Sequence, residues 1–474
     1  MDSMTTTVRR LALAVAAVAL GLASVAASAA IPARVTTAAA TVPVRFESFP
    51  GFPAPGTPAK YDHVGAIETG SRSAKNILVL VPGTSASAAY FEPLAKDIVR
   101  RAPHWQVWAV ERRENLLEDH SMLDRAKAHQ ATSQQLFDYY LGWLSHPAVT
   151  KHFQLIPDAQ VAFARQWGMQ VAVEDLHRVV QAAARHGGRV VLGGHSLGGS
   201  ITTAYATWDF NGHAGAAGLS GLVFIDGASS PTPVTTTAAT ASLQALQTAS
   251  PWLTFGGITA PYAGLFNAVS STIAHNDPNT PAVLASFPLL PKNLTAPVAV
   301  TNVAGYGYAL DTKTSPMGLT AAQAHLGQLA ASGTPRGWDP TGALTPIQRF
   351  ADMFSGTGLP GHDGTAWYHP QRLTLDSGAV ADGNTNPTQA ILDVHATHGH
   401  DLPKTLRIYA FGAALGGQRV LDATTALADQ SQIPAGQVTL INRASAYAHN
   451  DPAGASPTND FLANLVPFLA HVAP

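Results

Sequence analysis

The chain has 474 residues, of which 46% are hydrophobic and 12% are charged. A chain of this length and composition can bury a large core, so disorder of the whole chain is excluded. The 28 Lys and Arg residues nearly balance the 30 Asp and Glu residues, which excludes a strongly basic surface for nucleic acid or an anionic membrane. Because cysteine is absent, thiol catalysis, thiolate metal sites and disulfides are excluded as well. A small neutral molecule is the expected partner.

Residues 1–29 are predicted to be a secretory signal peptide. Two arginines at positions 9 and 10 precede an apolar run over residues 11–27, and the tripeptide ending at Ala29 fits a cleavage site. The run is Ala-rich and only marginally long for a bilayer core of about 30 Å, which favours a signal peptide over a membrane anchor. We therefore expect an extracellular protein without a stable membrane anchor. Residues 30–42 are expected to be a flexible leader.

Short, continuously apolar runs along the rest of the chain predict buried strands. Continuous rather than alternating runs are typical of a mostly parallel sheet that is covered by helices on both faces. An apolar stripe predicts a helix over residues 171–186, and a second helix is predicted over residues 457–470. The predicted strands are residues 77–81, 107–110, 190–192, 222–225, 406–411 and 438–441.

The long region between the predicted strands at residues 222–225 and 406–411 is predicted to be an inserted cap (lid) domain. Residues 228–403 contain short pieces punctuated by Ala, Thr, Pro and Gly, with scattered aromatic residues, and are too long for one loop. We expect this cap over the carboxyl edge of the sheet, where open α/β folds bind ligands. The core would then comprise residues 43–227 and 404–474. A second insertion, residues 116–167, is expected to pack beside the cap.

Ser196 is the predicted nucleophile. It lies at the centre of Gly194-His195-Ser196-Leu197-Gly198, after a buried strand and before a predicted helix over residues 201–207. The glycines allow the close backbone approach that a sharp strand-to-helix turn requires, and the helix N-terminus favours negative charge beside the serine. A plain Gly-rich turn is the alternative, but the flanking strand and helix favour the nucleophile.

This serine turn and its flanking elements resemble the α/β-hydrolase superfamily over residues 43–227 and 404–474. The sequence Gly-His-Ser-Leu-Gly-Gly is most similar to that of secreted bacterial lipases and esterases. The resemblance implies a mostly parallel central sheet flanked by helices, a Ser-His-acid triad, an oxyanion hole and no cofactor.

The oxyanion hole implied by the resemblance needs two backbone N–H donors. Leu197, the residue after the nucleophile, is the first. The second is expected in the loop after the strand at residues 77–81, where Pro82-Gly83 stands in place of the family's usual His-Gly pair. Thr84 is the predicted donor, and Ser85 is the alternative.

The resemblance places the catalytic histidine between the last strand and the last helix, where His449 lies. The superfamily's usual acid position, after the strand predicted at residues 406–411, falls in residues 411–418, which contain no carboxylate. Asp226 directly follows the strand predicted at residues 222–225 and keeps the chain order Ser, Asp, His, so it is the predicted acid. Asp422 remains the alternative. His195, inside the serine turn, is expected to be structural.

A second polar cluster precedes the strand predicted at residues 406–411 and consists of Asp393, His395, His398, His400 and Asp401. The side chains could ligate zinc or calcium. No pair has the i, i+4 spacing of ligands on one helix face, and Gly399 suggests a loop. We therefore expect a solvated polar turn, with neither a metal nor a cofactor.

These observations predict a secreted, monomeric serine hydrolase that acts on a small-molecule carboxylic ester or lipid. A peptidase, a lactonase, a thioesterase or a perhydrolase would use the same groups, and a non-catalytic binding protein of the same fold is the alternative from another class. Dehalogenases and epoxide hydrolases of the fold are excluded, because they need an aspartate where this chain has Ser196.

Overall fold

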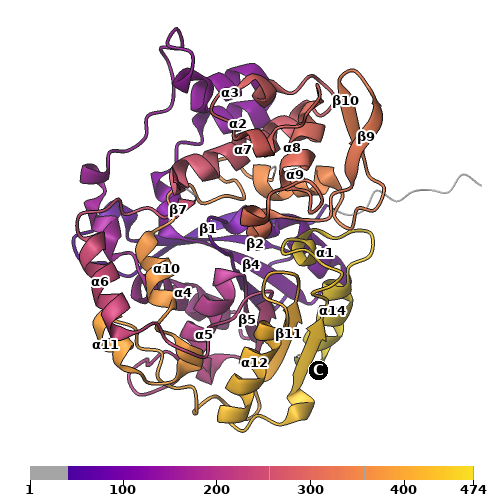
Figure 1. Ribbon diagram of the computed structural model, residues 1–474. Coiled ribbons are helices and arrows are strands. Elements are labelled where there is room, and N and C mark those ends of the chain that lie inside the picture. The colour runs from indigo at the N-terminus through magenta and orange to yellow at the C-terminus, as the bar shows by residue number, and fades with distance from the viewer. Residues whose placement is uncertain (1–40, 256, 357, 473–474) are drawn as a thin grey trace, which may run out of the picture. The chain divides into compact units, whose positions relative to one another are not determined.

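The computed structural model describes residues 41–255, 257–356 and 358–472 (Figure 1). The predicted signal peptide and residues 30–40 of the leader lie outside this part of the chain. No helix within the described residues is both long enough and apolar enough to span a bilayer.

An eight-stranded sheet with the strand order β1-β2-β4-β3-β5-β6-β11-β12 forms the centre of the fold. β2 pairs antiparallel with β1 and β4, and the remaining neighbours pair in parallel. This mostly parallel sheet, with helices in its connections, has the predicted α/β-hydrolase fold. The strands are β1 Val44–Pro50, β2 His63–Thr69, β3 Asn76–Val81, β4 Trp105–Glu111, β5 Val190–His195, β6 Gly221–Ile225, β11 Arg407–Gly412 and β12 Val438–Asn442.

Helices cover both faces of the sheet, as the continuously apolar strands predicted. On β3, Ile77 and Val79 enter one hydrophobic core, whereas Leu78 and Leu80 enter the other. The first core receives α4 (Met169–Ala184), α5 (Leu197–Thr207) and α12 (Gln418–Gln430). The second receives α1 (Glu92–Arg101) and α14 (Asp460–Val472).

The chain between β6 and β11 divides among several hydrophobic clusters. α10 and α11 join the core of α4 and α5, whereas α9 joins the core of α1. The elements of this region are α6 Thr236–Leu246, β7 Thr254–Phe255, β8 Ile258–Thr259, α7 Ala260–Asn276, α8 Asn302–Leu310, β9 Gln328–Gly333, β10 Arg336–Asp339, α9 Ile347–Ser355, α10 Gln371–Ser377 and α11 Pro387–Leu392.

A third hydrophobic cluster joins the 116–167 insertion to the region between β6 and β11. The insertion contributes α2 (Ser121–Lys127) and α3 (Ser133–Tyr140), which pack against α7 through such residues as Phe137 and Val269. Figure 1 shows α2, α3 and α7 side by side. The insertion therefore packs beside residues of the predicted cap, as expected from the sequence.

Candidate active site

Ser196 lies in the turn between β5 and α5 and has left-handed backbone angles, φ 56° and ψ −125°. A non-glycine residue in such a region costs of order 1–3 kcal/mol. Glycines make the turn possible, because a Cβ atom at Gly194 would lie 2.0 Å from the carbonyl oxygen of Gly198. A Cβ atom at Gly227 would lie 2.0 Å from the carbonyl oxygen of Ser196. The serine is half-buried at the carboxyl end of its strand.

His449 and Asp226 form a buried pair. Asp226 Oδ2 lies 2.6 Å from His449 Nδ1, and the two side chains are 0% and 1% exposed, respectively. Burial alone would raise the pKa of Asp226. The hydrogen bond and the charge of His449, together with the Ala413 N–H, instead hold this pKa below its ordinary value. The carboxylate accepts the Nδ1 proton, so Nε2 is the ring nitrogen that is left to act as a base.

The loop after β11, where the usual acid is missing, binds the carboxylate of Asp226 through its backbone. Asp226 Oδ1 accepts hydrogen bonds from the N–H groups of Ala413 at 2.7 Å, Gly416 at 2.9 Å and Gly417 at 3.2 Å. Leu415 N–H donates to Oδ2 at 3.2 Å. The loop therefore holds a carboxylate that the neighbouring strand supplies.

Asp422, the alternative acid, lies elsewhere. Its side chain is exposed on α12 and accepts a hydrogen bond from Gln418 Nε2 at 2.8 Å. The structure thus brings Asp226, and not Asp422, to His449.

The loop after β3 lies directly against Ser196. A Cβ atom at Gly83 would be 2.8 Å from Ser196 Cβ and 3.4 Å from Ser196 Oγ. The N–H of Ser85 is directed to His369 Nδ1 at 3.3 Å. Burial, and next the charge of Arg112, lower the pKa of His369 well below its ordinary value, so its ring is neutral and can accept. The N–H of Ser85 is therefore already hydrogen-bonded to His369, which favours Thr84 as the donor to an oxyanion.

Arg112, which the sequence analysis did not single out, orients this loop. The buried guanidinium donates to the carbonyl oxygens of Pro82 at 2.9 Å, Gly83 at 3.3 Å and Ala86 at 3.1 Å. In a trans peptide the carbonyl and the next N–H point in opposite directions. The bond to the Gly83 carbonyl therefore turns the Thr84 N–H away from Arg112.

The sequence does contain a pattern that could have indicated a buried polar role for Arg112. Residues 111–114 are four consecutive charged residues directly after a buried strand, in a chain with only 12% charged residues. In the structure, Arg112 Nε binds Glu114 at 2.6 Å, and both side chains are buried.

Leu197 is the first residue of α5, so its N–H is one of those that lack a partner within the helix. It is half-buried beside Ser196. Thr84 and Leu197 thus lie on the two segments that meet at the serine, the loop after β3 and the start of α5.

His195 has a structural role, as expected. Its Nε2 lies 2.9 Å from the carbonyl oxygen of His449, and its ring stacks on Tyr90 with centroids 5.2 Å apart. Burial, and next the neighbouring His449, lower the pKa of His195 to about 3. The neutral ring therefore donates from Nε2 and fixes the backbone of His449.

Asp451, at the start of α13 (Asp451–Gly454), also fixes the loop that carries His449. The fully buried carboxylate accepts from Ala448 N–H at 2.7 Å, Thr345 Oγ1 at 2.7 Å and His325 Nδ1 at 2.5 Å. These bonds tie the loop to the region between β6 and β11.

Within the described residues, no hydrogen bond joins Ser196 Oγ to His449. The bonds of His449 are those of Nδ1 and of its carbonyl oxygen.

The polar cluster before β11 forms separate pairs rather than one site. His395 Nε2 binds Asp393 at 2.9 Å, and both side chains are exposed. His398 instead lies between Asp401, at 2.9 Å, and Asp209, at 3.3 Å. His400 is exposed.

Comparisons with known proteins return structural neighbours only, since no family model and no curated protein matches the sequence. A candidate lipase from Sulfolobus solfataricus is 14% identical, covers 90% of this chain and 94% of its own, and has a TM-score of 0.48. A carboxyl esterase from Bacillus coagulans is 12% identical, with 91% and 99% covered and a TM-score of 0.39. A variant of monoglyceride lipase from Saccharomyces cerevisiae is 10% identical, with 94% and 99% covered and a TM-score of 0.39.

Proposed function

We propose that this protein is a serine hydrolase that cleaves carboxylic esters through an acyl-enzyme on Ser196. The observation that carries the proposal is the buried pair of Asp226 and His449, joined at 2.6 Å beside the left-handed turn of Ser196. His195, the residue before the serine, binds the backbone of His449 and so keeps the two segments together.

The proposed reaction follows from these groups. His449 Nε2 takes the proton of Ser196 Oγ as the oxygen attacks the ester carbonyl, and Asp226 stabilises the imidazolium that forms. The N–H groups of Thr84 and Leu197 would bind the oxyanion, where each donor contributes about 2.7–4 kcal/mol. His449 then returns the proton to the leaving alcohol, and water hydrolyses the acyl-enzyme.

Other acyl transfers, as in peptidases, lactonases and thioesterases, need the same groups, so the ester class is a proposal about substrate. The alternative of a non-catalytic binding protein rested on the loop after β11, which lacks a carboxylate. The missing carboxylate no longer favours this alternative, because the N–H groups of the loop bind the carboxylate of Asp226 instead.

Pre-steady-state kinetics with p-nitrophenyl esters test the proposal. We expect a burst of about one nitrophenolate per chain, followed by slower turnover. Ser196→Ala should abolish the burst. Turnover that is equal in the wild type, Ser196→Ala and His449→Ala would refute it. Rates across esters of increasing acyl length, with and without an oil interface, then separate a lipase from an esterase.

We also propose that the protein is exported and cleaved after Ala29, on the basis of the sequence pattern alone. Mass spectrometry of protein recovered from the culture medium should find Ala30 at the N-terminus. Full-length chain retained in the cells would contradict export.

A further inference from the structure

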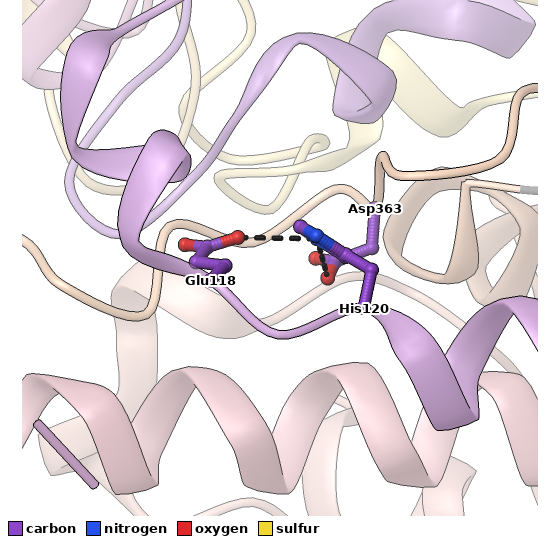
Figure 2. Close-up of side chains that lie close together, drawn as sticks. All are labelled: Glu118, His120 and Asp363. Atoms are coloured by element: carbon purple, nitrogen blue, oxygen red, sulfur yellow. Dashed lines mark ion pairs between the residues drawn. The ribbon is translucent and has the colours of Figure 1, made fainter. Parts of the chain in front are cut away.

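Glu118, His120 and Asp363 form a second group of titratable side chains, which takes no part in the proposed reaction (Figure 2). One potential ligand atom from each lies within 4.8 Å of the other two, and no other trio of such side chains in the described part of the chain converges in this way. Glu118 and His120 follow β4, whereas Asp363 comes from the loop after α9.

The spacing of these atoms fits a bound metal. His120 Nε2 lies 3.2 Å from Glu118 Oε2 and 3.2 Å from Asp363 Oδ2. This nitrogen is buried and has no hydrogen-bond partner among the described residues, because neither oxygen lies along its N–H direction. A tetrahedral ion about 2.0–2.1 Å from each ligand would hold neighbouring ligand atoms about 3.3 Å apart.

Two buried carboxylates face a single imidazole at this site. The side chains of Glu118 and Asp363 are both 0% exposed, and His120 is the residue with which each forms its ion pair within the described chain. Buried charges in proteins are paired or bound to metals. A divalent cation would compensate both carboxylates.

Hydrogen bonds from outside the trio hold the carboxylates in place. Glu118 Oε1 accepts from Trp367 N–H at 2.6 Å, and Asp363 Oδ1 accepts from Thr365 N–H at 2.6 Å. The oxygens that face the imidazole receive longer bonds, 3.3 Å from Asn115 Nδ2 and 3.2 Å from Trp367 Nε1. Such outer bonds orient the ligands of metal sites.

We propose that Glu118, His120 and Asp363 bind one zinc ion. An imidazole with two carboxylates suits zinc better than calcium or magnesium, which prefer oxygen ligands alone. Three protein ligands leave one position for water.

The position of the site gives the metal a structural role. Thr365, two residues from Asp363, bridges Ala86 of the loop after β3. Ala366 N–H donates to the Ser85 carbonyl at 2.9 Å, and Ser87 N–H donates to the Gly364 carbonyl at 3.2 Å. The ion would therefore join the segment after β4 to a segment that supports the loop beside Ser196.

Zinc retention tests the proposal. Untagged full-length protein is stripped with a chelator, incubated with zinc chloride, gel-filtered and analysed for metal. We expect about one zinc per chain, and a higher Tm than for the stripped protein. Glu118→Gln and Asp363→Asn should retain less than about a tenth as much zinc, whereas the matched control Asp393→Asn, from an exposed Asp–His pair, should retain as much as the wild type. Wild type without zinc, or equal retention in all variants, overturns the proposal.

X-ray absorption at the zinc edge needs no variant. We expect nitrogen and oxygen ligands at about 2.0–2.1 Å with the scattering of one imidazole. Two or more imidazoles would place the ion on other histidines and would also overturn the proposal.

Discussion

The carboxylate of Asp226 and the imidazole of His449 meet at 2.6 Å where neither side chain reaches solvent. Asp226 follows β6, His449 follows β12, and the N–H groups after β11 fix the carboxylate between them. Three neighbouring strands of one parallel sheet thus orient a single imidazole.

Asp226→Asn should lower kcat by about 10⁴-fold, because an amide cannot stabilise the imidazolium or fix the same tautomer. The matched control is Asp422→Asn, which should leave kcat unchanged because Asp422 is exposed and is hydrogen-bonded to Gln418 rather than to His449. Circular dichroism verifies that both variants fold. The reverse pattern, with loss only in Asp422→Asn, would assign the acid to Asp422.

Arg112→Lys should lower kcat about 10- to 100-fold with little change in KM, because a compact ammonium lacks the planar fork that reaches three carbonyls and Glu114 at once, and the loop beside Ser196 would lose its orientation. Arg113→Lys is the control. Arg113 is also buried but binds Asp175 at 2.6 Å and Asp62 at 2.8 Å rather than this loop. Both changes should lower stability, and only the first should slow the reaction. Equal kcat values in the two variants would remove Arg112 from the account.

Gly83→Ala should reduce kcat at least about 10-fold, since the new methyl group would lie 2.8 Å from Ser196 Cβ and 3.0 Å from the carbonyl oxygen of His195. At Gly436 the same substitution meets nothing within 4 Å and should have no effect. Steady-state kinetics of both proteins provide the measurement. Full activity of Gly83→Ala would mean that the loop does not lie against the serine.

The low pKa of His195 predicts a loss of stability in acid. Its pKa falls from an ordinary 6.5 to about 3 in the folded protein, so the unfolded chain binds more protons between these values. The free energy of unfolding should therefore decrease as the pH falls below about 6.5, by up to about 1.4 kcal/mol per pH unit from this residue. Urea titrations of His195→Gln, which keeps an N–H donor, should show a shallower dependence. Identical slopes for variant and wild type would contradict the assignment.

The sequence predicted the parallel part of the sheet well but missed its antiparallel edge. Five of the six predicted strands, β3, β4, β5, β6 and β11, are buried on both faces and therefore continuously apolar, whereas β12 lies at the edge of the sheet and is partly exposed. In β2, by contrast, Gly65 and the charged Glu68 interrupt the run, and Glu68 is buried through an ion pair with Arg45 of β1. A strand whose buried polar residues form ion pairs with a neighbouring strand has no continuous apolar run, so its sequence does not indicate a buried strand.

The chain order placed Asp226 and His449 in positions that the structure brings together, and their catalytic roles stay predictions. Arg112 and the N–H donors after β11 could not be inferred in the same way. Arg112 binds backbone carbonyls and the N–H groups bind the carboxylate of Asp226, in each case in segments distant in sequence, and only the fold shows which segments meet. The same holds for Asp363, which joins Glu118 and His120 from the other side of the serine turn in the sequence.

Covalent labelling of Ser196 tests the central claim most directly. A fluorophosphonate added to the intact protein should bind about one per chain, and peptide mapping should place it on Ser196. Ser196→Ala should bind no fluorophosphonate, and the labelling rate of His449→Ala should fall by at least about 10³-fold. Absence of labelling in a folded wild-type protein, or labelling that persists in Ser196→Ala, would contradict the account.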